Sequence, residues 1–136
     1  MYVIGLYLAE KQHDAEAIFV DTKPKRIALH VVVGEAGVER FLNGFRKGIE
    51  KNHSEAQLAA LRERLAAFEQ MFSHIKTIKR GDLIAFDWLP AAGTRVSLNG
   101  AELGRIAGED FYRALLSIWI GGKPVTDDLK KALLGS

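Results

Sequence analysis

The sequence predicts an α+β domain in which an antiparallel sheet carries a layer of helices on one face. Segments with the two-residue period of strands and segments with the 3.6-residue period of helices occur in blocks instead of alternating one for one. Asn99-Gly100, between two strand-like segments, is typical of a type I′ hairpin turn. The 136 residues, 48% hydrophobic and 26% charged, are typical of one globular domain spanning residues 1–136.

The strand signals are alternation of side chains and turn residues at the ends. Alternate residues from Ile27 to Val33 share one face of the clearest strand. The predicted strands are residues 1–8, 26–33, 82–88, 94–98 and 101–106. Because a natural domain seldom begins inside a strand, we expect residues upstream of Met1 to be missing.

Four segments have the periodicity of amphipathic helices. Residues 35–51 place apolar side chains in one stripe and charged ones away from it. Ser54 and Gln57 have the spacing of a capping box, which predicts a second helix running on to Phe72. The other two predicted helices open at Gly108 and Thr126 and end at Gly121 and Gly135.

Composition excludes several classes of function. There is no cysteine, so disulfides, thiolate metal ligands and cysteine nucleophiles are excluded. The net charge of +2 is spread along the chain without a basic block, which predicts no nucleic-acid partner. Apolar runs of about five residues are far shorter than the roughly 20 needed to span a bilayer. The four histidines lack ligand spacing, and no cofactor motif is present, so neither a metal nor a cofactor is expected.

The titratable residues that attract attention have structural interpretations. The carboxylate pairs Glu109-Asp110 and Asp127-Asp128 fall where helices begin, where they suit the helix dipole and free N–H groups. Alternation places Asp87 opposite its aromatic neighbours, so we expect it to face solvent. His30, flanked by valines on a strand, is predicted to be a hydrogen-bonded structural histidine, with a pocket role as the alternative.

Small and aromatic residues point to packing more than to chemistry. Gly44 and Gly48 lie one turn apart on the first long helix, which predicts close packing of that helix. The aromatic set is predicted to form the core, with lining of an apolar cavity as the alternative. Its members are Phe41, Phe45, Phe68, Phe72, Phe111 and Trp119.

Three segments together resemble the chalcone isomerase family, in particular its bacterial chalcone isomerase-like branch. Residues 2–8, YVIGLYL, are similar to the family's A-I-G-V-Y-L-E strand. Residues 108–116 open a helix that continues into IWIGGKPVTDDLK at 118–130, which is similar to M-I-G-x-x-x-V-x-x-D-L-K. The resemblance implies an antiparallel sheet under a helical layer, with a ligand cleft between them.

The resemblance also implies that the catalytic residues of the plant enzymes are absent from this sequence. Plant chalcone isomerases use an upstream arginine, two threonines, a tyrosine and an asparagine to position and polarise the substrate. The threonine positions fall at Tyr2 and Ile118, and the other residues have no equivalents in this sequence. Loss of a hydroxyl donor removes a polar contact where enolate charge would develop. Chalcone isomerase activity is therefore not expected, and no catalytic residue is assigned.

Non-enzymatic members of the wider family bind fatty acids in the same cleft, so the resemblance implies a non-catalytic binder of a fatty-acid-like or other small apolar ligand. The expected cleft lining is Tyr2, Ile4, Phe45, Ile49, Ile118 and Trp119. One alternative is an isomerase or lyase of unknown substrate that uses Tyr2 with His30. The other is an interaction protein with a filled core that forms a homodimer through an unpaired strand edge. The compartment stays open: periplasmic if an export signal has been removed, otherwise cytoplasmic.

Overall fold

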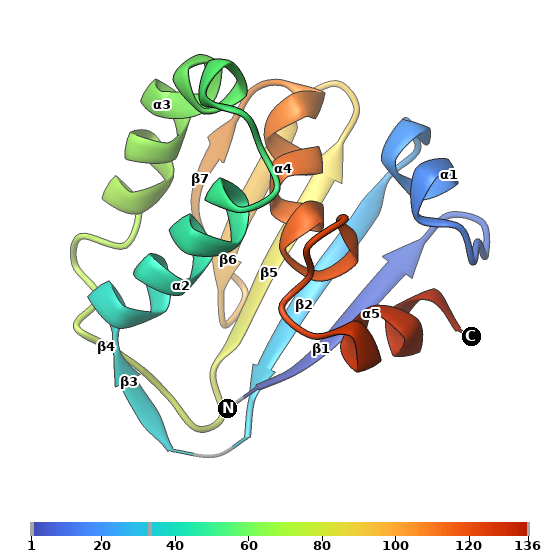
Figure 1. Cartoon of the computed structure of the whole chain (residues 1–136). Coiled ribbons are helices and arrows are strands. Elements are labelled where there is room, and N and C mark those ends of the chain that lie inside the picture. Colours follow the sequence, from blue (N-terminus) through green and yellow to red (C-terminus); the bar gives the residue numbers. More distant parts are fainter. Residues whose placement is uncertain (1, 33, 136) are drawn as a thin grey trace.

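The main sheet has five strands, all antiparallel, in the order β1-β2-β5-β6-β7 (Figure 1). The computed structural model describes residues 2–32 and 34–135. The strands of this sheet are β1 (Tyr2–Leu8), β2 (Lys25–Val31), β5 (Leu83–Leu89), β6 (Gly93–Leu98) and β7 (Ala101–Ile106). Met1 and Val33, included in two predicted strands, lie outside the described residues.

The helices α2, α3 and α4 lie over one face of this sheet, as Figure 1 shows. The α+β class and the antiparallel sheet with its helical layer are therefore confirmed. The helices are α1 (Ala15–Val20), α2 (Val38–Glu50), α3 (Glu55–Gln70), α4 (Glu109–Ile120) and α5 (Asp127–Leu134). None of those seen in residues 2–32 and 34–135 has the length and apolar character needed to cross a membrane.

The local signals in the sequence form as predicted. Asn99 and Gly100 both have positive φ, 53° and 87°, as the tight β6–β7 turn requires. At the start of α3, the Gln57 N–H donates to Ser54 Oγ at 3.2 Å, and the Ser54 N–H donates to Gln57 Oε1 at 2.8 Å. The capping box therefore sets the first turn of α3.

The predicted helix over residues 35–51 begins three residues too early. Its first residues form the strand β3 (Glu35–Gly37), which pairs with β4 (Thr77–Lys79) in a second sheet. Neither β4 nor the six-residue α1 was predicted from the sequence. Strands of three residues have no readable period, and only a partner from a distant segment makes them strands.

Aromatic side chains fill the space between the sheet and the helices. Phe45 on α2 contacts Phe86 on β5 and Trp119 on α4, with ring centroids 5.6 Å and 5.5 Å apart. A Cβ added at Gly48 would lie 3.0 Å from Cγ2 of Ile118, so this glycine lets α2 approach α4 closely. Nothing lies within 4 Å of the same position at Gly44. Of the predicted aromatic core, all but the half-buried Phe41 are fully buried.

The other face of the sheet holds the main electrostatic correction. Asp87 does point away from the helices, but it is 4% exposed and not solvent-facing as predicted. Arg26 Nε donates to its carboxylate at 2.6 Å and Arg95 at 2.9 Å, so guanidinium groups from both neighbouring strands cover it. Burial by itself raises the pKa of Asp87, but these hydrogen bonds hold it below its ordinary value.

Candidate functional site: a groove between two helices

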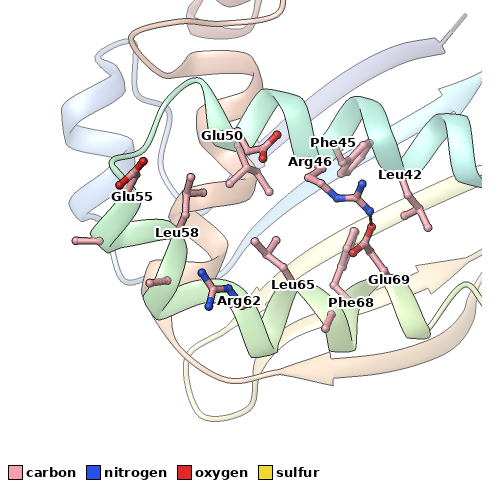
Figure 2. A pocket seen from close by; sticks show the side chains of 14 residues that line it. Leu42, Phe45, Arg46, Glu50, Glu55, Leu58, Arg62, Leu65, Phe68 and Glu69 are labelled. Carbon is pink, nitrogen blue, oxygen red and sulfur yellow. Dashed lines mark hydrogen bonds and ion pairs between the residues drawn. The ribbon is translucent and has the colours of Figure 1, made fainter.

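An apolar groove with a volume of about 790 Å³ lies between α2 and α3 (Figure 2). The two helices run side by side over the sheet, joined by the short turn that carries the Ser54 cap. This volume is within the range of about 300–1,000 Å³ found for small-molecule sites. The lining comes from both helices and is apolar at the bottom and charged at the rim.

The bottom of the groove is aromatic and aliphatic. Phe45 and Phe68 stack with ring centroids 6.0 Å apart and an interplanar angle of 21°, and Ile49 lies buried at the same level. Leu58 and Leu65 on α3 are half-buried, so their side chains are available to a molecule lying in the groove. Alanines at positions 56, 59 and 66 keep the α3 wall low.

An ion pair between Arg46 on α2 and Glu69 on α3 crosses the groove near one end. Beyond it a second, more polar hollow of about 890 Å³ continues between the helices, bordered by the same two residues. Glu50 and Glu55 lie toward the other end, near the α2–α3 turn. Arg62 is exposed on the rim, and its guanidinium group has no hydrogen bond or ion pair within the described part of the chain.

The residues predicted to line a cleft divide into two groups. Phe45 and Ile49 do contribute to the groove. Trp119, with its Nε1–H donating to the Tyr2 hydroxyl at 3.1 Å, lies in the packed core, where Ile118 faces Gly48. Ile4 borders only a hollow of about 10 Å³ beside Trp119, about the size of one water molecule. All six residues lie on the helix side of the sheet, with Phe45 and Ile49 at the groove and Ile4 and Trp119 at the small hollow.

Comparison with known proteins places this arrangement in a family. The model of a family described as chalcone isomerase-like matches residues 1–135. The chain belongs to the chalcone isomerase-like family. A solved structure of a fatty-acid binding protein from Arabidopsis thaliana is similar, with a TM-score of 0.71, over 98% of this chain and 76% of that chain. At 19% identity this likeness shows the fold. No curated protein matches the sequence significantly.

The isomerase alternative needed Tyr2 and His30 to act together in this chalcone isomerase-like domain. They lie on opposite faces of the sheet, because Tyr2 pairs with Val31 and His30 pairs with Val3 in the β1–β2 register. The His30 side chain is exposed and makes no hydrogen bond among the described residues, so its predicted role as a hydrogen-bonded structural histidine is wrong. No acid–base pair forms at these positions.

The titratable groups with shifted pKa values lie away from the groove. Burial raises the pKa of Tyr112, whose hydroxyl donates to the carbonyl of Phe86 at 2.8 Å. Burial lowers the pKa of Lys25, whose Nζ donates to the carbonyl of Asp21. Both side chains donate to backbone carbonyls, and neither lines the groove. Across the described residues, no cluster of three acidic or histidine side chains is arranged to hold a metal ion.

Several residues that give the groove its shape were not predicted from the sequence as part of a site. Leu58 and Leu65 belong to an apolar helical stripe, which indicates burial but not against which neighbour. The Arg46–Glu69 pair joins residues 23 positions apart, so no local spacing reveals it. The available signal was the set of alanines at positions 56, 59 and 66 on α3, since small residues on one helix face leave room for another molecule beside the helix.

Proposed function

We propose that this protein is a non-catalytic carrier of a fatty-acid-like or other small apolar ligand, which it holds between α2 and α3. The observation that carries the proposal is the groove with a bottom of Phe45, Phe68 and Ile49 and a charged rim. An open apolar groove of this volume on a folded domain favours binding of an apolar molecule. Family membership and the fold shared with a plant fatty-acid binding protein support the same class of ligand.

The rim supplies a place for a polar headgroup. Arg62 is the rim arginine without a described partner, whereas Arg46 is paired with Glu69. A ligand carboxylate beside Arg62 would leave its chain free to lie over Leu58, Leu65 and the aromatic bottom. Because Arg62 is exposed, its contribution to binding is expected to be small, and most of the affinity would come from the apolar chain.

The proposal is tested first by native mass spectrometry of the purified protein, followed by organic extraction and identification of any acyl chain. Titration with a fluorescent fatty acid then measures affinity. Ala59→Trp, which fills the groove, is expected to raise the dissociation constant by about tenfold or more. Ala60→Trp is the matched control, because Ala60 is exposed on the same helix but does not line the groove.

Equal affinities for these two variants would exclude the groove as the site, and absence of binding by the unmodified protein would overturn the proposal. A methyl ester that binds within a few-fold of the free acid would agree with a tail-dominated site.

A second candidate function is an interaction protein with a filled core. The packing of Tyr2, Ile118 and Trp119, which leaves about 10 Å³ beside Ile4, favours it over a ligand cleft deep between sheet and helices. A protein that purifies empty and binds no acyl chain would support this candidate over the carrier.

A further inference from the structure

The apolar groove and the more polar hollow beyond it adjoin each other along α2. Both are lined by Leu42 and Arg46 on α2 and by Ala66 and Glu69 on α3. Since Leu42 and Ala66 are apolar, apolar surface continues past the Arg46–Glu69 ion pair from the groove into this polar hollow. Together the groove and the polar hollow follow α2 from its first residue to its last, over roughly 20 Å. One elongated molecule can therefore occupy both.

Polar side chains form the walls of the polar hollow, above the buried Leu42 and Phe72. Besides Arg46 and Glu69, these are Glu39, Arg40, Asn43, Gln70 and Ser73. All five are exposed, and none of their side chains makes a hydrogen bond or an ion pair within residues 2–32 and 34–135. Their hydrogen-bonding groups are therefore free to contact a bound molecule.

The unpaired charges that line the polar hollow are one of each sign. Glu39 and Arg40 have no ion-pair partner among the described residues, whereas the charges of Arg46 and Glu69 compensate each other. A purely anionic headgroup would be attracted by Arg40 and repelled by Glu39. A headgroup that carries both an anion and a cation can pair with both residues. The charges of the polar hollow therefore favour a zwitterion over a simple anion.

We propose that the polar hollow is a headgroup site for single-chain lipids with a zwitterionic phosphoester headgroup, the chemistry of a lysophospholipid. This inference rests on the proposed carrier function and names a ligand class for the same site. The phosphate would lie at Arg40 and the ammonium group at Glu39. The alkyl chain would pass Leu42 into the apolar groove and cover Phe45.

A simple fatty acid has no group that fits the polar hollow. Arg62 lines the groove and not the polar hollow, so it stays the residue beside which the carboxylate of a fatty acid would lie. The two classes of lipid would therefore share the apolar groove and place their polar ends at different residues. This difference makes the headgroup site testable separately from the groove.

A comparison of headgroups on chains of equal length is the first test. Displacement of a fluorescent fatty acid measures the affinities of hexadecanoate, hexadecyl phosphate and hexadecanoyl lysophosphatidylcholine, each below the concentration at which it aggregates. The lysophosphatidylcholine is expected to bind about threefold to tenfold more tightly than hexadecyl phosphate, because pairs between exposed charges each contribute modestly. Equal or weaker binding of the lysophosphatidylcholine would overturn the proposal.

A variant that fills the polar hollow tests where the headgroup lies. Asn43→Trp is expected to raise the dissociation constant of the lysophosphatidylcholine by about tenfold and to leave that of hexadecanoate within about twofold, because Asn43 lines only the polar hollow. Lys47→Trp is the matched control, since Lys47 is exposed on the same helix and lines neither the groove nor the polar hollow. It should change neither affinity.

A charge variant tests the recognition of the zwitterion. Glu39→Gln with Arg40→Gln removes both unpaired charges, and should bring the affinities of the lysophosphatidylcholine and of hexadecyl phosphate to within about twofold of each other. A preference for the lysophosphatidylcholine that survives this double variant would contradict the assigned roles of the two residues. Circular dichroism of each variant separates loss of binding from loss of the fold.

Failure of this proposal and failure of the carrier function give different results. If hexadecanoate binds and Asn43→Trp leaves the affinity for the lysophosphatidylcholine unchanged, the headgroup site is wrong and the carrier function stands. If the unmodified protein binds none of the three ligands, both proposals are overturned.

Discussion

Helix α2 meets its two neighbouring helices in different ways. Against α4 it packs closely, because Gly48 has no side chain and Ile118 occupies that space, while Phe45 contacts Trp119 edge to face at 5.5 Å. Against α3 the contact is made by aromatic rings at the bottom and by the Arg46–Glu69 pair at the rim, with the groove left between them. We refer to these as the α2–α4 seam and the α2–α3 seam.

The difference separates a closely packed side of α2 from the side on which the proposed ligand would lie. The α2–α4 seam is filled by buried residues of large volume, among them Phe45, Ile118 and Trp119. Such packing contributes directly to the free energy of unfolding. The α2–α3 seam leaves apolar surface of Leu58 and Leu65 partly in water, which a ligand would cover.

The largest expected effect is in the α2–α4 seam. Trp119→Ala should lower the free energy of unfolding by about 3–5 kcal/mol, because it empties a site that is 1% exposed. Urea denaturation measures this loss. Tyr2→Phe removes only the hydroxyl that accepts from Trp119, and should cost about 0.5–1.5 kcal/mol. Similar losses for both variants would mean that the cavity is refilled by neighbouring side chains.

The two glycines of α2 provide an intermediate comparison. Gly44→Ala should stabilise the protein by about 0.5–1 kcal/mol, because alanine favours the helix and nothing lies within 4 Å of the new methyl group. Gly48→Ala should gain less or destabilise, because its methyl group would lie 3.0 Å from Ile118. Equal gains in thermal denaturation would show that the α2–α4 seam is looser than the structure indicates.

The smallest expected effect is at the rim of the α2–α3 seam. Arg46→Gln removes the ion pair with Glu69, both partly exposed, and should cost about 0.2–1 kcal/mol of folding stability. The cost should shrink as salt is raised, since exposed charges are screened. Denaturation at low and high salt checks this, and a loss as large as that of Trp119→Ala would contradict a peripheral role for the pair.

Much of the secondary structure could be predicted because its signals are local. Asn99-Gly100, Ser54 with Gln57, and the helix-ending Gly121 and Gly135 act on the backbone within a few residues of themselves. The family was also recognisable, because its motifs are contiguous. Burial was harder to predict, since Asp87 stands on the expected face yet is covered by Arg26 and Arg95 from neighbouring strands.

The sequence by itself determined the α+β class, the sheet under helices and the membership of the chalcone isomerase-like family. Only the tertiary structure decided that Tyr2, Ile118 and Trp119 fill the interior, that the groove opens between α2 and α3, and that β3 pairs with β4. The reason is physical: backbone preferences depend on near neighbours along the chain, whereas a cavity depends on whether side chains from distant segments, such as Gly48 and Ile118, fill the same space.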